Sequence, residues 1–146
     1  MAEADMRRLS AARRWSRRLA MQAVYQWQMT GQSAADIERQ FHDDASFPKA
    51  DVEYFRDLLY GVIGHSDELD AALGTSMEWQ VAHVDPVERA ILRCACFELL
   101  RRPGVPFKVI INEAVELTKK FGSEQGHKFV NGVLDKLAPQ LRPNVR

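Results

Sequence analysis

Residues 84–104 read VDPVERAILRCACFELLRRPG and combine clear helix boundaries with the most apolar helix interior in the chain. Asp85 is a favourable N-cap residue, Pro86 suits the first helical position, and Glu88 can complete a capping box. Gly104 is typical of the residues that follow a helix. Because the interior is apolar on nearly every side, we expect this helix at the centre of a domain, with neighbours on most sides.

Apolar residues recur at three- and four-residue spacing throughout the rest of the chain, a period typical of helices. No stretch alternates long enough to predict a strand, so the predicted fold class is all-α. The other predicted helices cover residues 15–30, 34–42, 51–74, 109–122 and 123–139. The long helix over 51–74 contains Gly61 and Gly64 in its interior, and we expect it to bend there.

Length and composition indicate one domain. The chain has 146 residues, of which 46% are hydrophobic and 27% charged, and this is enough to bury a core without disulfides. No apolar run approaches the ~20 residues of a membrane span, so we expect a soluble protein that does not enter a membrane. We expect residues 1–12 to be a basic, mobile lead-in and residues 13–146 to be one domain, with packed subdomains over about 13–80 and 81–140.

The chain shows no pattern typical of catalysis, of a metal site or of a cofactor site. Cys94 and Cys96 lie two residues apart in the most apolar helix, where they cannot bridge and are expected to pack as small apolar side chains. Such cysteines favour a reducing compartment, and we expect the cytoplasm. The segment FGSEQGHK lacks the spacing of a phosphate loop. The histidines stand far apart, at His42, His65, His83 and His127. We therefore predict a protein that is not an enzyme and holds no metal or cofactor.

Charge is unevenly distributed along the chain, although the formal total is zero. Residues 1–18 hold six arginines against two acids, a net charge of +4. Residues 34–70 carry −7 and residues 71–146 carry +3. A basic end on a neutral body indicates a polyanion or an acidic partner at that end. A targeting peptide is the alternative, but Glu3, Asp5 and the direct continuation into an apolar helix argue against it.

Four arginines surround a tryptophan where the first predicted helix begins, in the segment RRWSRR. Guanidinium groups fork onto phosphate oxygens or stack on bases, and an indole offers a flat apolar face. Such a cluster suits single-stranded or looped RNA better than a duplex groove. The candidate RNA-binding residues are Arg13, Arg14, Trp15, Arg17 and Arg18. The alternative is a solvated basic tail whose tryptophan belongs to the core.

A second group of cations lies around the boundary between the last two predicted helices. Lys119 and Lys120 end one helix, where they also complement its dipole. Lys128 and Phe129 fall in the first turns of the next helix. The phenylalanine either stacks on a base or packs in the core, and the neighbouring lysines favour a place for all four residues in an RNA-binding surface.

Five segments follow one another without large gaps: RRWSRRLAMQAVYQWQ, YFRDLLYGV, VERAILRCACFEL, VPFKVIINEAVELTKKFG and HKFVNGVLDKLAP. Over almost the whole chain they resemble the NusB family of bacterial transcription antitermination factors. The resemblance implies an all-α fold of two perpendicular helical bundles and no catalysis. It also implies binding to boxA RNA of ribosomal RNA transcripts together with the ribosomal protein NusE. In a complex with other Nus factors, this binding helps RNA polymerase to resist termination.

The resemblance also implies roles for individual residues. The family's arginine-rich motif falls on the four arginines of RRWSRR, and its RNA-contacting phenylalanine falls on Phe129. Its partner surface includes the positions of Tyr25 and Glu88. A carboxylate at Glu88 repels phosphate but can pair with a basic ribosomal protein, so we expect it to serve the protein complex rather than RNA binding.

The chain departs from the family pattern at three positions. Arginine is usual at Trp15, and an acid can stand at Arg18 and at Gln125. A neutral Gln125 repels phosphate less than an acid would, so we expect it to tune RNA affinity. Some relatives self-associate across the RNA-binding face, so a homodimer is an alternative to a free monomer. The rival function is a helical adaptor that binds only proteins and has no specific affinity for RNA.

Overall fold

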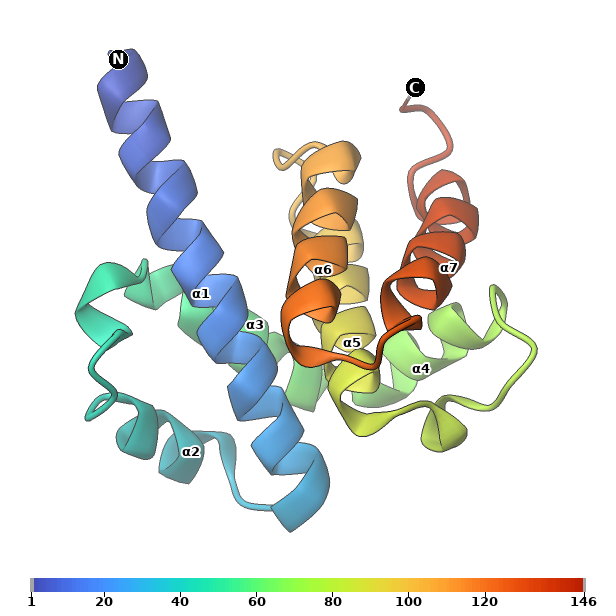
Figure 1. Ribbon diagram of the computed structural model, residues 1–146, viewed down its shortest axis with the longest axis horizontal. Coiled ribbons are helices and arrows are strands. Elements are labelled where there is room, and N and C mark those ends of the chain that lie inside the picture. The colour runs from blue at the N-terminus through green and yellow to red at the C-terminus, as the bar shows by residue number, and fades with distance from the viewer. Residues whose placement is uncertain (1, 146) are drawn as a thin grey trace.

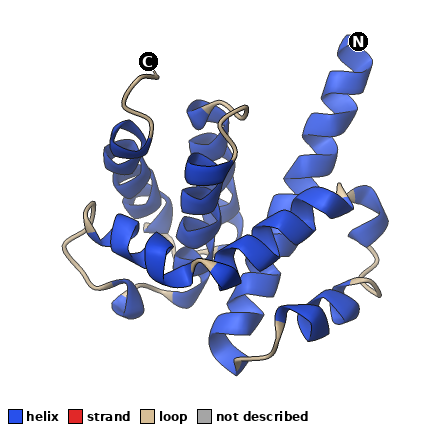
Figure 2. Cartoon of the chain, turned by 180° about the vertical axis from the view of Figure 1, so that it is seen from behind, coloured by secondary structure: helices blue, strands red, loops and turns tan. Residues whose placement is uncertain are grey.

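Helices make up most of the computed structural model, which describes residues 2–145 (Figure 1). The α-helices are α1 (Glu3–Thr30), α2 (Ala34–Phe41), α3 (Val52–Gly64), α4 (Ser66–Gly74), α5 (Pro86–Arg101), α6 (Phe107–Phe121) and α7 (Gly126–Leu141). Two short 3₁₀ turns, η1 (Phe47–Lys49) and η2 (Val81–His83), lie in the α2–α3 and α4–α5 connections. No strand occurs between residues 2 and 145 (Figure 2), which confirms the all-α prediction.

Helix α5 occupies the centre of the fold, as its sequence predicts. It contacts α1, α3, α4, α6 and α7, and Figure 1 shows it behind α6, between α1 and α7. Most of its apolar side chains are buried, among them Ile91, Leu92 and Cys96. The Asp85 carboxylate caps its start by accepting the amides of Val87 and Glu88 at 3.0 and 3.2 Å.

The helices pack as two groups that share α5. Helices α1, α2 and α3 contact one another, while α6 and α7 pack together on the other side of α5. Helix α4 follows α3 in the chain but contacts both α5 and α7. Seen from behind in Figure 2, α3 and α4 run across the upright helices α5, α6 and α7. This is the two-bundle arrangement that the family resemblance implies.

The long helix predicted over residues 51–74 is two helices. The backbone of His65 leaves helical geometry with φ −125° and ψ 24°, so α3 ends at Gly64 and α4 begins at Ser66. Gly61 serves packing rather than bending. A Cβ at this position would lie 2.2 Å from the ring of Phe97, so the missing side chain allows α3 to approach α5 closely.

Two other helix boundaries differ from the predicted ones. Helix α1 begins at Glu3 instead of near Trp15, so residues that the sequence assigned to a lead-in continue the helix. Their expected mobility stays a prediction. Helix α7 begins at Gly126 rather than Ser123, and it continues through Pro139 to Leu141 instead of ending at the proline.

Arg142, directly after α7, closes the end of α5. Its buried guanidinium donates to the carbonyl oxygens of Glu98, Leu99, Arg102 and Val105 at 3.1, 2.9, 2.7 and 2.6 Å. The carbonyl oxygens of Glu98 and Arg102 also accept backbone amides. The Leu99 carbonyl is among the last of the helix, which have no intrahelical partner, so Arg142 satisfies a group that a helix end leaves free. Between residues 2 and 145, no helix has the length and apolarity needed to cross a membrane.

Candidate nucleic-acid interface

A groove of about 800 Å³ lies between the first half of α1 and one face of α6. Figure 1 shows the two helices side by side, with α1 extending past α6 at its N-terminal end. The groove brings part of each cationic group together, because α1 contributes Arg14 and Arg18 and α6 contributes Lys120. Its lining residues are Ser10, Arg14, Trp15, Arg18, Val109, Asn112, Glu113, Glu116, Leu117 and Lys120.

The four arginines of RRWSRR divide into two pairs, each with the i, i+4 spacing of one helix face. Arg14 and Arg18 line the groove. Arg13 and Arg17 lie over the ring of Tyr54, with guanidinium carbons 4.6 and 5.3 Å from its centroid. Two of the four arginines thus face the groove and two face Tyr54, and RNA contact by Arg13 and Arg17 stays a prediction.

Arg17 is buried and fully engaged in this structure. Its guanidinium donates to both oxygens of Glu98 at 3.0–3.1 Å and to the hydroxyl of Tyr54 at 3.3 Å. Burial lowers the pKa of Arg17, but the hydrogen bonds and charge of Glu98 outweigh this effect and hold that pKa above its usual value. Burial and the adjacent Glu98 also raise the pKa of Tyr54, so its hydroxyl stays protonated and donates to the same carboxylate.

Arg13 is half-buried rather than free. Its Nε lies 3.8 Å from a carboxylate oxygen of Asp51, beyond hydrogen-bond distance, and that Nε has no other partner within residues 2–145. The guanidinium of Arg102 also lies over the Tyr54 ring, 4.4 Å from its centroid. Three arginines thus surround one tyrosine, and the negative charge of Glu98 beside them balances part of their repulsion.

Trp15 lies at the edge of the groove and is only half-buried. The guanidinium carbon of Arg18 is 5.1 Å from its ring centroid and 4.9 Å from that of Phe121. Lys49 adds a second cation, 4.8 Å from the indole centroid. Trp15 therefore places an indole with two adjacent cations in the lining of the groove, and it is not fully enclosed in the core.

Acidic side chains on α6 balance part of the groove's positive charge. Glu113 accepts from the Nε of Arg14 at 3.0 and 3.3 Å and lies 3.8 Å from a terminal nitrogen of Arg17. Glu116 lines the groove one turn further on and lies 3.5 Å from Lys119. A phosphate that enters the groove therefore has to compete with Glu113 for Arg14.

The predicted lysines and Phe129 occupy one side of the molecule near the α6–α7 connection. Lys119 and Lys120 are exposed at the end of α6, and Lys128 is exposed in the first turn of α7. Phe129 is half-buried against the core and stacks on Trp79, with ring centroids 5.5 Å apart and planes 27° apart. Trp79 is not among the residues that the sequence pattern singled out, because it stands alone between Glu78 and Gln80 without a cationic cluster.

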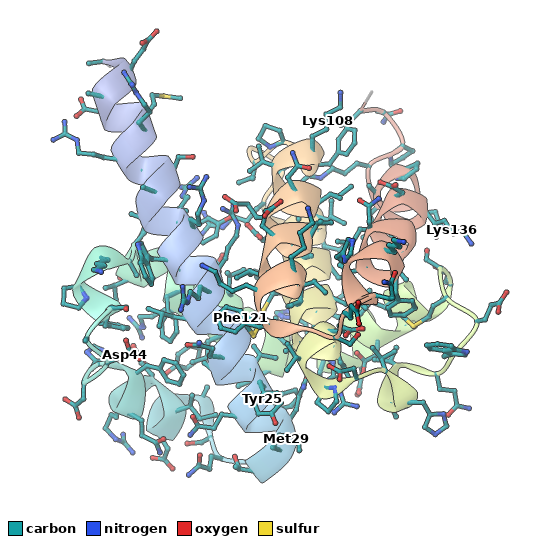
Figure 3. All side chains as sticks on the ribbon, viewed as in Figure 1. Tyr25, Met29, Asp44, Lys108, Phe121 and Lys136 are labelled. Carbon is teal, nitrogen blue, oxygen red and sulfur yellow. The ribbon has the colours of Figure 1, made fainter. Side chains whose placement is uncertain are left out.

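The two predicted partner residues differ in accessibility. Tyr25 is exposed on α1, near the exposed Met29, and both are labelled toward the C-terminal end of that helix in Figure 3. Glu88 is only 5% exposed. One of its oxygens accepts from the backbone amide and the hydroxyl of Ser123 at 3.0 and 2.7 Å. The expected capping box is therefore absent, and Glu88 instead anchors the α6–α7 loop.

That loop is built around the Glu88 carboxylate. A Cβ at Gly126 would lie 2.4 Å from its Oε2, so any larger residue at the start of α7 would displace this carboxylate. Gln125 precedes it as an exposed N-cap residue whose side chain makes no capping hydrogen bond. Gln125 therefore lies on the surface between the ends of α6 and α7, where its neutral side chain adds no repulsion of phosphate.

Between residues 2 and 145, no group of three histidine, cysteine or acidic side chains is arranged to hold a metal ion. Cys94 and Cys96 are buried and unpaired, as predicted. Burial raises the pKa of both thiols, that of Cys96 to about 12, which opposes thiolate chemistry at neutral pH.

Sequence comparison identifies the family to which the chain is similar. Residues 14–139 match the sequence model of the NusB family. The transcription antitermination protein NusB of Pseudomonas savastanoi pv. phaseolicola is 53% identical over 133 residues, covering 91% of this chain and 81% of that protein. The family is one of transcription antitermination factors and not of enzymes.

Solved structures share the fold at lower identity. Thermotoga maritima NusB superimposes with a TM-score of 0.76 at 29% identity, covering 88% of this chain and 91% of that one. A structure of antitermination factors NusB and NusE in complex with double-stranded RNA gives a TM-score of 0.75 at 24% identity, covering 88% of this chain and 97% of that one.

Proposed function

Because the chain belongs to the NusB family, we propose that it binds boxA-type single-stranded RNA of ribosomal RNA transcripts together with the ribosomal protein NusE. In this role it acts with other Nus factors in the cytoplasm, where it helps RNA polymerase to resist termination. The observation that carries the proposal is the groove between α1 and α6, in which Arg14, Arg18 and Lys120 line one channel with Trp15 at its edge.

The chemistry of this groove favours single-stranded RNA. Guanidinium and ammonium groups bind phosphate oxygens without reading sequence, while an exposed aromatic face holds an unpaired base. Lys119, Lys128 and Gln125 are exposed on the surface that continues toward α7. Arg13 and Arg17 support the site from within: we propose that they position α1 rather than contact phosphate.

NusE is proposed to bind the other end of α1, where Tyr25 and Met29 are exposed. Aromatic side chains often supply a large share of the energy of protein interfaces. The buried Glu88 contributes indirectly, since it holds the loop from Ser123 to Gly126. The proposal predicts that Tyr25→Ala weakens NusE binding by about 1–2 kcal/mol or more without changing RNA binding by the isolated chain.

The test is a fluorescence-anisotropy titration of a boxA-like RNA and a scrambled control RNA, with and without NusE, at two salt concentrations. We expect tighter binding to the boxA-like RNA, and a further gain when NusE is present. Equal and weak binding to both RNAs would overturn the proposal and favour the protein-only adaptor. Sedimentation of the free chain would show whether it forms a homodimer that hides the groove.

A charge-matched pair of variants locates the site. The triple variant Arg14→Ala, Arg18→Ala, Lys120→Ala removes three groove cations. The slope of log K against log salt concentration should therefore become less steep by about 2. The control triple variant Arg39→Ala, Lys108→Ala, Lys136→Ala removes three exposed cations that do not line the groove. If both triples lose the same affinity, RNA binding is diffuse and the groove is not the site.

A further inference from the structure

Trp79 is a large apolar side chain that does not line the groove. It lies between α4 and η2, and 60% of its surface is exposed. One face of its ring stacks on Phe129 of α7, with centroids 5.5 Å apart and planes 27° apart. An indole buries a large apolar area when it is enclosed, so leaving most of it in water forgoes a substantial stabilisation.

Phe129 provides a firm support for this indole. Its own ring is half-buried and packs against the hydrophobic core. The stacked pair therefore consists of an inner ring fixed by the core and an outer ring open to solvent. Such an outer ring can accept a further flat ring at small cost in conformational entropy, because its own orientation is already restricted by the inner one.

The surroundings of Trp79 suit a nucleobase. A shallow, open surface beside it is lined by Glu78, Trp79, Gln80 and His83. The glutamine and histidine can donate and accept hydrogen bonds, and Glu78 can accept from an exocyclic amine, so the edge of an unpaired base finds both kinds of partner. Lys128, exposed next to Phe129 in α7, supplies a cation for the adjoining phosphate.

The pair also continues the surface proposed for RNA. Phe121, beside Arg18 at the end of α6, is labelled between α1 and the lower end of α6 in Figure 3. From there the loop from Gly122 to Gln125 crosses to the start of α7, as Figure 1 shows, and Phe129 lies in the first turns of that helix. The groove and the stacked rings thus lie at the two ends of one short connection.

We propose that Trp79 stacks on an unpaired base of the bound RNA, so that Trp79 and Phe129 form a two-ring platform beyond the α1–α6 groove. This inference rests on the proposed RNA-binding function. It adds a specific aromatic contact, outside the arginine cluster, that holds the RNA as it leaves the loop between α6 and α7.

The experiment compares Trp79→Ala and Trp79→Phe with the wild-type chain in the boxA-like RNA titration. We expect Trp79→Ala to weaken binding by roughly 5- to 150-fold, the range for loss of one base–aromatic stack. Trp79→Phe keeps a ring and should retain most of the affinity. Tyr60→Ala, which removes an exposed aromatic ring of α3 that lines neither the groove nor the surface beside Trp79, should bind as tightly as wild type.

Two further readouts separate stacking from a structural effect. In a Trp15→Phe, Trp27→Phe variant, Trp79 is the remaining tryptophan, and its fluorescence should be quenched when RNA binds. An abasic nucleotide at the stacking position should weaken binding to wild type but not to Trp79→Ala. Thermal melting of Trp79→Ala close to that of wild type excludes unfolding as the cause.

The outcomes are distinguishable from those of the proposed function. If wild type binds RNA and Trp79→Ala binds it equally well, the platform is refuted while the RNA-binding function stands. If Trp79→Ala loses only NusE binding, the exposed ring serves a protein interface and the inference is wrong. If wild type itself has no RNA affinity, the proposed function fails first and the platform fails with it.

Discussion

Arg17 of α1 donates to both carboxylate oxygens of Glu98 of α5, with N–O distances of 3.0 and 3.1 Å, in the interior of the fold. The two residues are 6% and 2% exposed, so neither charge is well hydrated. Their pairing holds the first half of α1 against the central helix. With Arg17 turned inward, helical periodicity places Arg14 and Arg18 toward α6 and the groove.

Arg17→Ala should destabilise the fold strongly. The change leaves Glu98 as a buried carboxylate without its main partner, and breaking such a pair typically costs roughly 3–5 kcal/mol. Urea denaturation of the variant measures the loss. Arg14→Ala is the matched control, since its side chain is 67% exposed and its removal should cost about 1 kcal/mol or less. Equal stability of Arg17→Ala and wild type would show that the pair does not hold α1.

Glu113→Gln should strengthen RNA binding. Glu113 accepts from Arg14, so removing its charge frees that guanidinium for phosphate and lowers the negative potential in the groove. We expect a gain of roughly 2- to 5-fold in affinity at low salt, the size of one exposed ion pair. Anisotropy titration measures it. Glu53→Gln, an exposed acid on α3, is the control and should bind as wild type. A loss of affinity in Glu113→Gln would mean that the carboxylate orders Arg14 for binding.

Two glycine-to-alanine changes should have opposite effects on stability. At Gly61 a Cβ would lie 2.2 Å from the ring of Phe97, so alanine forces α3 and α5 apart and should cost roughly 1–3 kcal/mol. At Gly132 in α7 nothing lies within 4 Å of the added carbon, so alanine should stabilise by about 0.5–1 kcal/mol through its better helix propensity. Thermal melting measures both. Destabilisation of the same size at both positions would contradict the packing role of Gly61.

Stability should fall in acid partly through Glu38 on α2. Burial raises the pKa of Glu38, but hydrogen bonds from Tyr60 and His42 and the charge of Arg56 outweigh it and hold that pKa below its usual value. A depressed pKa means that the stabilisation is complete above the unfolded-state pKa of about 4.3 and is lost as the pH falls through the folded-state value. The stability advantage of wild type over Glu38→Gln, measured by urea denaturation, should therefore be full at neutral pH and shrink in acid. An advantage that stays constant with pH would contradict this origin.

The amino-acid sequence determined the elements of this fold through short-range effects. The cap at Asp85, the proline at the start of α5 and the 3.6-residue period of apolar side chains act within a few residues, so they identify α5 and its central place without any tertiary information. Residue type alone also identifies the charged and aromatic candidates, which are the arginine cluster, the lysines at the end of α6 and Phe129.

Tertiary structure decided which of these side chains are available. Arg17 and Arg18 are neighbours in sequence, yet one pairs with Glu98 of α5 and the other faces the groove. Glu88 meets Ser123, and Trp79 meets Phe129, through contacts between elements that are distant in the chain. Such contacts depend on how amphipathic helices pack against one another, and local propensity and periodicity carry no information about the partner that each buried charge or exposed ring finds.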